Sequence, residues 1–383
     1  MKTKIAAAIA LSLLAGSTFA APTFYGEIDA SVDYLPEDNA SGTSDKDVVE
    51  VSSNSSYLGV KGDEKLNDRL SAVYLAEWAF NADGDGTDWS ARNRYVGLKD
   101  AKLGTVKVGA HDTPLKQLSG VVDTFNNYVA NKADITGIMT GETRLANVVV
   151  YEAPALTLPT GAVKFNALLA TGEASGISKG NGASKAAGRG LGDTWSASLV
   201  YDSPMFVAGV AYDKAVPTTF AGRGMTNASV AEVTSGVAGT AFAAANTLRA
   251  IGRLNVLDNS LSLKALYQTS EVEETTYADT KASDYATNLA NAQDIDKSDG
   301  WLVGAEYNIP SAKAWTIKAQ YSANTTSFKS NKDDYDADQI MAGVDYAFSK
   351  QVKMYGYGGY LTLEQGDDET KQPVVGTGLE FKF

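Results

Sequence analysis

The sequence predicts an all-β fold, a transmembrane antiparallel β-barrel of about sixteen strands, and three observations carry this prediction. Alternating segments of roughly ten residues recur along the chain. Short and long connections alternate between them. The last segment places Val375, Leu379, Phe381 and the terminal Phe383 on one face, opposite glycines and charged residues. A barrel needs such a closing strand because lipid cannot satisfy the polar groups of an open sheet edge.

The N-terminal residues predict export. Residues 1–20 start with Lys2 and Lys4, continue with the apolar run 5–15 and end on small residues, which is the pattern of a secretory signal. We expect cleavage after Ala20. No later stretch reaches about eighteen consecutive apolar residues, so no transmembrane helix is expected. The predicted organisation is a signal peptide, 1–20, followed by a single barrel domain, 21–383.

Composition limits the classes of function. The net charge of −13 argues against a nucleic-acid partner. The chain has no cysteine and a single histidine, His111, which excludes disulfides, most catalytic triads and zinc sites. We therefore expect no enzyme activity, no metal site and no cofactor. The hydrophobic fraction of 44% is compatible with a membrane barrel, in which only alternate residues face lipid.

The clearest strand is the first, residues 24–34. Phe24, Ile28 and Val32 share one face, and the acidic residues Glu27, Asp29 and Asp33 share the other. One face therefore suits lipid and the other water. Further candidates are 54–63, 69–81, 90–99, 104–110, 145–152, 162–171, 193–201, 205–213, 247–257, 260–270, 300–309, 313–323, 338–348, 351–362 and 373–383.

The connections and aromatic residues favour a membrane barrel over a soluble all-β protein. The connections near 202–204, 258–259, 310–313 and 349–350 are tight, whereas 36–53, 172–192, 214–246 and 271–299 are long. Short turns are expected at the periplasmic end and long loops outside, an asymmetry that a soluble sandwich does not need. Aromatic pairs such as Trp195 with Tyr201 and Trp301 with Tyr307 predict girdles at the two membrane interfaces.

Several motifs, in order, resemble a known family. They are Y-L-G-V-K-G-D-E-K-L at 57–66, R-L-S-A-V-Y at 69–74 with Glu77, R-N-R-Y-V-G-L-K at 92–99, G-T-V-K-V-G at 104–109 and D-T-P at 112–114, then Arg144, Asn147, Tyr151 and Pro154. This run is similar to the general porins of Gram-negative outer membranes, in the neisserial and burkholderial branch. The motifs lie between about 24 and 154, and the strand pattern with its terminal phenylalanine covers the rest.

The resemblance implies a trimeric, sixteen-stranded barrel in the outer membrane that passes ions and small hydrophilic solutes by diffusion. It also implies that the third external loop, here about 111–144, folds into the lumen and narrows it. This loop mixes apolar residues such as Phe125 and Ile138 with acids such as Asp134, which suits packing against an inner wall. A mobile surface loop is the alternative. Outer-membrane lipid and lipopolysaccharide are the expected surroundings.

The resemblance also supplies candidate pore-lining residues. They are the cations Lys61, Arg92, Arg94, Lys107 and Arg144, the acids Glu77, Asp123, Asp134 and Glu142, Tyr57, and the acids Glu27, Asp29 and Asp33 of the first strand. Strand parity supports Lys61 and Glu77 as lumenal, but it turns Arg92 outward unless a β-bulge intervenes.

The sequence departs from the family at three places. Tyr57 and Ala110 stand where arginines are usual, and Glu380-Phe381 replaces the usual Arg-His. With fewer wall cations and several lumenal acids, we expect a weak preference for cations. Arg249 and Arg253, lumenal by parity, argue the other way. The alternatives are a substrate-specific channel, a structural or adhesive barrel, and an outer-membrane enzyme that uses Ser and carboxylates.

Overall fold

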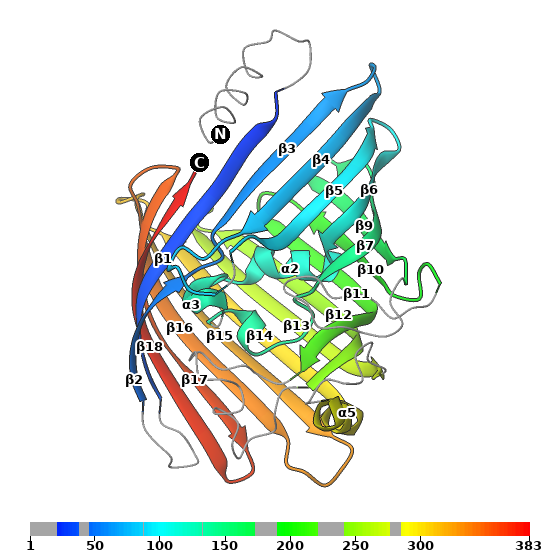
Figure 1. The fold of residues 1–383 in the computed structure, drawn as a ribbon. Coiled ribbons are helices and arrows are strands. Elements are labelled where there is room, and N and C mark those ends of the chain that lie inside the picture. The colour runs from blue at the N-terminus through cyan, green and yellow to red at the C-terminus, as the bar shows by residue number, and fades with distance from the viewer. Residues whose placement is uncertain are drawn as a thin grey trace, which may run out of the picture.

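The chain forms one closed antiparallel β-barrel (Figure 1). The computed structural model describes residues 21–37, 46–86, 88–131, 133–172, 190–220, 241–275 and 285–383. The predicted signal peptide, 1–20, lies outside the described residues. Among those that are described, no helix is long and apolar enough to cross a membrane.

The described residues form the following elements. The strands are β1 (Thr23–Glu37), β2 (Lys46–Ser53), β3 (Tyr57–Lys65), β4 (Leu70–Ala79), β5 (Ser90–Asp100), β6 (Gly104–Asp112), β7 (Arg144–Glu152), β8 (Leu156–Leu158), β9 (Gly161–Ala170), β10 (Trp195–Asp202), β11 (Phe206–Phe220), β12 (Ala241–Val256), β13 (Leu261–Glu274), β14 (Ile295–Asn308), β15 (Trp315–Phe328), β16 (Tyr335–Ala347), β17 (Val352–Gln365) and β18 (Asp368–Lys382). The helices are α2 (Pro114–Val122), α3 (Tyr128–Asn131), the 3₁₀ helix η1 (Ile135–Gly137) and α5 (Tyr285–Asp294).

These eighteen strand segments correspond to sixteen barrel strands. Segments β2 and β3 both pair with β1, one after the other, and are separated by residues 54–56, where Ser55 has a φ of 61°. In the same way, β7 and β8 pair with successive parts of β9. Each of these two pairs is therefore one interrupted strand, and the prediction of about sixteen antiparallel strands is confirmed.

The barrel closes between its first and last strands. Strand β1 pairs with β18 over the register Glu27↔Lys382 to Tyr34↔Val375. The backbone of Gly26 adds two hydrogen bonds, donating to the Phe383 carbonyl at 3.0 Å and accepting from the Phe383 N–H at 3.1 Å. The predicted pairing of the C-terminal strand with the 24–34 strand is confirmed, and it leaves no open edge between the two ends of the sheet.

The outer face of the barrel is apolar. Phe24, Ile28 and Val32 of β1 and Leu379 of β18 are exposed, whereas Asp29 and Asp33 between them are buried. Aromatic side chains pair across neighbouring strands at two levels, since Trp315 contacts Tyr346 at one end of β15 and β16, and Trp301 contacts Tyr321 near the middle of β14 and β15. The alternation read from the sequence thus separates a lipid-compatible outside from an inward face.

The strands of the C-terminal half extend beyond the predicted boundaries at the long-loop end. Strand β11 continues to Phe220 and β12 begins at Ala241, inside the stretch 214–246 that was expected to be a loop. The expected loop 271–299 contains helix α5, whose Ala292 packs with Phe220 and Ile295. The alternation stops there because consecutive residues are buried on both faces, as residues 241–245 are, so the periodicity could not mark these extensions as strands.

Candidate functional site

Residues 113–143, between β6 and β7, form what we call the inner segment. Thr113 caps helix α2, since its side-chain oxygen accepts a hydrogen bond from the Lys116 N–H at 3.1 Å, and Pro114 occupies the first turn. Helix α2 contacts strands β9 to β13. Its residues Leu115, Leu118 and Val122 belong to the same buried cluster as inward-facing residues of those strands, namely Val207, Ala211, Ile251 and Leu266. The inner segment therefore packs on the inward face of the barrel wall.

Arg249 on β12 is the main polar anchor of the inner segment. This side chain is fully buried, and its Nη1 lies 2.5 Å from Glu142 Oε1. It also donates to the carbonyl oxygens of Leu115, at 3.3 Å, and Thr140, at 3.0 Å, and to Gln268 Oε1, at 2.6 Å from Nη2. Strand parity predicted an inward-facing Arg249. Glu142 of the inner segment offsets the charge of this arginine.

The opposite part of the inner segment binds the wall at β15 to β17. Gln320 bridges two residues of the segment, because it donates to Asp123 Oδ1 at 3.0 Å and accepts from the Thr124 N–H at 2.7 Å. Tyr128 stacks on Tyr355 with ring centroids 4.5 Å apart, and its hydroxyl accepts from Lys318 Nζ at 2.5 Å. The segment is thus held on both sides of the barrel.

This packing overturns part of the expectation for the acids of β1. The hydroxyls of Tyr355 and Tyr357 donate to Asp29 and Asp33, which are 1% and 0% exposed. These two carboxylates point inward, as parity predicts, but they do not line open water because the tyrosines and Tyr128 of the inner segment lie over them.

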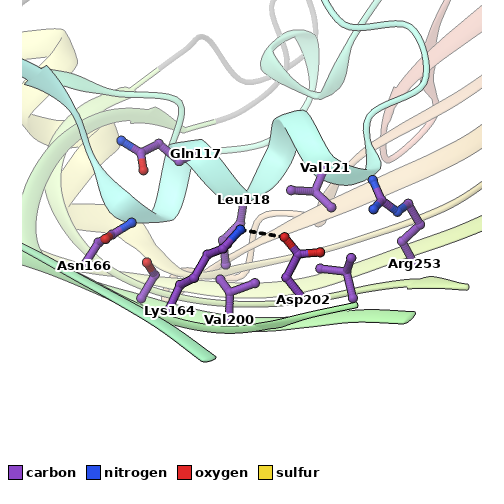
Figure 2. Close-up of a pocket in the computed structure, with 10 residues that line it drawn as sticks. Gln117, Leu118, Val121, Lys164, Asn166, Val200, Asp202 and Arg253 are labelled. Carbon is purple, nitrogen blue, oxygen red and sulfur yellow. Dashed lines mark hydrogen bonds and ion pairs between the residues drawn. The ribbon is translucent and has the colours of Figure 1, made fainter. Parts of the chain in front are cut away.

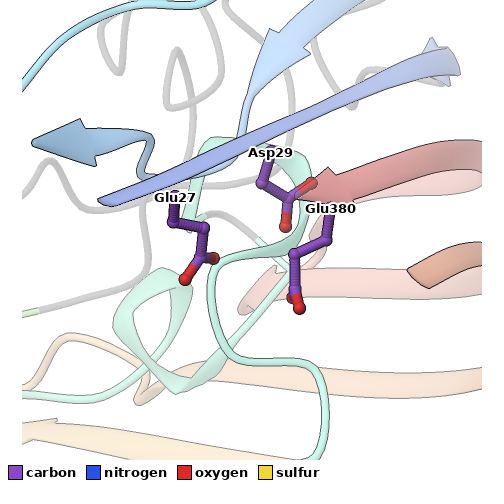
Figure 3. A group of neighbouring side chains, drawn as sticks. All are labelled: Glu27, Asp29 and Glu380. Atoms are coloured by element: carbon purple, nitrogen blue, oxygen red, sulfur yellow. The ribbon is translucent and has the colours of Figure 1, made fainter. Parts of the chain in front are cut away.

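Glu27, also buried, lies close to Asp29 and to Glu380 of β18 (Figure 3). Cations already offset this group, since Lys353 lies 2.8 Å and Lys382 lies 2.7 Å from Glu380, and Lys382 lies 3.7 Å from Glu27. Glu27 and Glu380 are therefore part of the ion-pair network of the closing seam, and Asp29 lies beside them as an acceptor from Tyr355.

A polar cavity of about 510 Å³, which we call the β5–β7 cavity, lies between the inner segment and strands β5 to β7. Three acids and three cations line it, together with amide and hydroxyl side chains. The charged residues are Arg92, Asp112, Lys116, Asp134, Glu142 and Arg144. Four of them, Arg92, Asp134, Glu142 and Arg144, were predicted to line the pore.

A β-bulge brings Arg92 to the inward face. The register of β4 and β5 shifts between Ala76↔Arg94 and Trp78↔Ala91, so that Arg92 and Asn93 both lie opposite Glu77. The guanidinium of Arg92 forms an ion pair with Glu77 and lies 4.7 Å from the centre of the Tyr57 ring. An arginine from β5, two strands away from β3, thus covers the tyrosine that replaces the family's arginine.

Arg94 lies in the regular part of β5, beyond the bulge, and the expectation that Arg94 lines the pore is wrong. Arg94 is exposed on the outer face together with Val96 and Leu98. The bulge lies between Ala91 and Arg94, so it reverses the face of Arg92, while Arg94 keeps the outward face that simple parity gives it.

Asp112 joins the cations of the β5–β7 cavity. Its Oδ1 lies 3.0 Å from Arg144 Nη2 and 3.2 Å from Lys116 Nζ. Asn93 orients the pair, because it accepts from Arg144 Nε at 2.8 Å and donates to Asp112 Oδ2 at 2.8 Å. Asp112 and Lys116 were not predicted as site residues. The i, i+4 spacing across the Thr113-Pro114 helix start could have identified them.

Burial sets the charge state of two acids of the inner segment. Asp134 accepts hydrogen bonds from the backbone N–H groups of Thr136, at 2.8 Å, and Asn127, at 3.2 Å. Loss of hydration and the neighbouring carboxylate of Asp123 raise the pKa of Asp134 to about 7. Burial also raises the pKa of Asp123, which is hydrogen-bonded to Gln320 and does not border the cavity.

The other predicted residues do not line the β5–β7 cavity. Lys61 Nζ lies 4.5 Å from the centre of the Tyr25 ring, whose hydroxyl donates to Glu77 at 2.9 Å. Lys107 pairs with Glu152 at 2.5 Å. Lys61 and Glu77 share one face of the sheet with Tyr25.

Comparison with known proteins agrees with this architecture. Residues 6–366 match the family model described as Gram-negative porin. The major outer membrane protein P.IB of Neisseria lactamica is 25% identical over 98% of both chains. The same protein of Neisseria gonorrhoeae is 29% identical over an alignment that spans 41% of this chain and 46% of that one, about half the length of the relative.

Solved structures share the fold. An anion-selective porin from Comamonas acidovorans superposes with a TM-score of 0.64 at 18% identity, covering 95% of this chain and 99% of that one. The trimer form of OmpT from Vibrio cholerae gives a TM-score of 0.61 at 14% identity, with coverage of 95% and 99%. The chain therefore belongs to the Gram-negative porin family and is a protein of the outer membrane.

Proposed function

We propose that this outer-membrane channel for small solutes passes ions and small hydrophilic molecules by passive diffusion, and that the inner segment narrows it at the β5–β7 cavity. The proposal rests on the contacts that bind the inner segment to the barrel wall. It is bound to the inward face at β12 through Arg249 and at β15 through Gln320. A polar cavity of about 510 Å³ borders it on the β5–β7 side. Polar walls suit hydrated solutes, which keep part of their hydration during transit.

We further propose that the channel prefers cations only weakly. The charged residues that line the cavity include three acids and three cations, and Arg144 and Lys116 share Asp112 as their partner. Arg92 is neutralised by Glu77. Opposite charges across a narrow passage orient dipolar solutes, whereas an excess of one sign selects ions. With a near balance, small differences in ionisation decide the preference.

Reversal potentials of single channels in a potassium chloride gradient test the proposed selectivity. We expect a small potential of the sign given by excess potassium permeation, and a larger one after Arg92→Gln because Glu77 then lacks its partner. Lys313→Gln, in the tight β14–β15 turn away from the cavity, is the matched control. A clear chloride preference of the unaltered channel contradicts the proposal.

The size dependence of transport distinguishes general diffusion from a substrate-specific channel. In a liposome-swelling series of sugars and amino acids, we expect rates that fall smoothly with solute size. A single solute that is much faster than others of its size would instead favour the substrate-specific alternative. The absence of measurable conductance would favour a structural or adhesive barrel. We propose no catalytic role, because the sequence has one histidine and no cysteine.

We also propose that the protein works as a homotrimer embedded in lipid and lipopolysaccharide after removal of residues 1–20. The trimer form of the Vibrio cholerae neighbour and the apolar outer face support this assembly. Migration on a gel before and after heating, combined with chemical cross-linking, tests it. A mass corresponding to one chain in the unheated, cross-linked sample would overturn the trimer.

A further inference from the structure

A second cavity, of about 210 Å³, lies on the wall side of helix α2 and has no role in the diffusion path described above. We call it the β9–β12 cavity. Gln117, Leu118 and Val121 of α2 form one side, and residues of β9 to β12 form the other (Figure 2). It lies near the tight turns that follow Asp202 and Val256. Gln117 borders both cavities, so the two spaces are neighbours across the helix.

The lining combines an apolar surface with one uncompensated cation. Leu118, Val121, Val200 and Val207 supply the apolar part. Lys164 and Asp202 form an ion pair at 2.6 Å, drawn as a dashed line in Figure 2. Arg253 lies beside Val121 in the same view, and no dashed line joins it to another residue.

The Nε atom of Arg253 is buried and has no hydrogen-bond partner among the described residues. The neighbouring acids already have partners, since Asp202 binds Lys164 and Glu306 binds Lys264, the cross-strand neighbour of Arg253, at 2.6 Å. The guanidinium of Arg253 lines the cavity, so its positive charge can attract an anion there.

We propose that the β9–β12 cavity is a binding site for small monocarboxylates with a short apolar body, a role that goes beyond passive diffusion through the β5–β7 cavity. The planar guanidinium of Arg253 matches a carboxylate with two parallel hydrogen bonds. The apolar body lies between Leu118 and the valines. The volume limits the ligand to a small one, and the carboxylate of Asp202 repels a second negative charge.

Titration calorimetry on the folded protein in detergent tests this site, with 3-methylbutanoate as the probe. We expect saturable binding of one probe per chain. Two related compounds should bind at least about tenfold more weakly. They are the alcohol 3-methylbutan-1-ol, which has no charge, and 3-methylpentanedioate, which has two negative charges. A hydrogen bond to a charged group contributes a binding free energy that corresponds to about this change in affinity.

Three variants locate the binding. Arg253→Gln should weaken 3-methylbutanoate binding by about tenfold or more. Lys313→Gln, which removes a positive charge from the exposed β14–β15 turn and does not line the cavity, should leave the affinity unchanged. Val121→Phe should abolish binding without a change of charge, because the ring fills the cavity. Migration on a gel before and after heating shows that each variant is folded.

The proposal is overturned if no saturable binding occurs, if the alcohol binds as tightly as the carboxylate, or if Lys313→Gln lowers the affinity as much as Arg253→Gln does. If Arg253→Gln fails to fold, Val121→Phe decides, because undiminished binding to that variant places the probe elsewhere. None of these outcomes depends on ion conductance, so the failure of this site and the failure of the proposed channel function are distinguishable.

Discussion

At the scale of single residues, the position of one extra residue in β5 decides which arginine can reach the solute. The shift between Ala76↔Arg94 and Trp78↔Ala91 turns Arg92 inward to Glu77 and leaves Arg94 on the outer face. Neither arginine differs from the other in chemistry. The difference in their roles therefore comes entirely from the local count of residues against the neighbouring strand.

Asp134 should make the ion preference depend on pH. Its pKa of about 7 lies above the usual value because burial and Asp123 disfavour the carboxylate, so the group is neutral well below pH 7 and charged above it. The preference for cations should fall as the pH decreases from 8 to 6. Reversal potentials across this range measure the effect. Asp134→Asn should give a flatter profile, and a wild-type profile that is already flat would contradict the assignment.

The raised pKa of Asp134 also makes the stability of the folded chain depend on pH. The folded chain holds a proton on Asp134 that the unfolded chain releases near the ordinary pKa of an aspartic acid. The resulting stabilisation is fully present below that ordinary value and is lost as the pH rises through about 7. The inner segment is therefore expected to be seated more firmly at the acidic end of this window.

At the scale of elements, the inner segment is the part of the chain that most depends on contacts distant in sequence. Helix α2 has only nine residues, which is too short to be stable in water alone. Its apolar residues Leu115, Leu118 and Val122 pack on the wall, and Arg249 binds its neighbours through Glu142 and two backbone carbonyls. The barrel wall thus determines where the segment lies.

Replacing Arg249 with Met should loosen this segment. The change leaves Glu142 buried without its cation, a defect that costs about 3–5 kcal/mol in buried pairs. We expect faster hydrogen–deuterium exchange in residues 114–142 and a higher single-channel conductance. Lys297→Met removes an exposed pair with Asp299 and should alter neither. Unchanged exchange in the Arg249 variant would show that apolar packing alone holds the segment.

At the scale of the whole molecule, closure of the sheet stabilises the barrel. The ring of Phe383 lies over Gly26, where an added Cβ would approach a ring carbon to 2.6 Å. The two backbone hydrogen bonds between Gly26 and Phe383 extend the β1–β18 ladder to the last residue of the chain. A side chain at position 26 would therefore displace the terminal aromatic ring.

Deletion of Phe383 should weaken closure. It removes two hydrogen bonds, each contributing about 0.5–1.5 kcal/mol, and the stacking of Phe383 on Phe381. We expect a lower urea midpoint for refolding into detergent micelles. Gel migration before and after heating measures the folded fraction at each urea concentration. Phe348→Ala, which removes an exposed aromatic side chain near the β16–β17 turn, is the control. Equal midpoints for the deletion and the control would contradict a special role of the closing residue.

The sequence by itself determined the barrel, its strand number, its outer apolar face and the pairing of its two ends. These properties follow from period-two alternation, which is local and which lipid enforces on every strand. Parity also placed Lys61, Glu77 and Arg249 on the inward face. The long-loop extensions of β11 and β12 were missed because no lipid imposes alternation there.

The tertiary structure decided which inward charges can act. Asp29 and Asp33 face inward but are covered by Tyr355 and Tyr357, and Arg249 is covered by the inner segment. Arg92 reaches the cavity through a bulge, and Arg253 keeps a free donor because its neighbours are paired. Burial, pairing and bulges arise from contacts between residues far apart in sequence, and no local pattern encodes them.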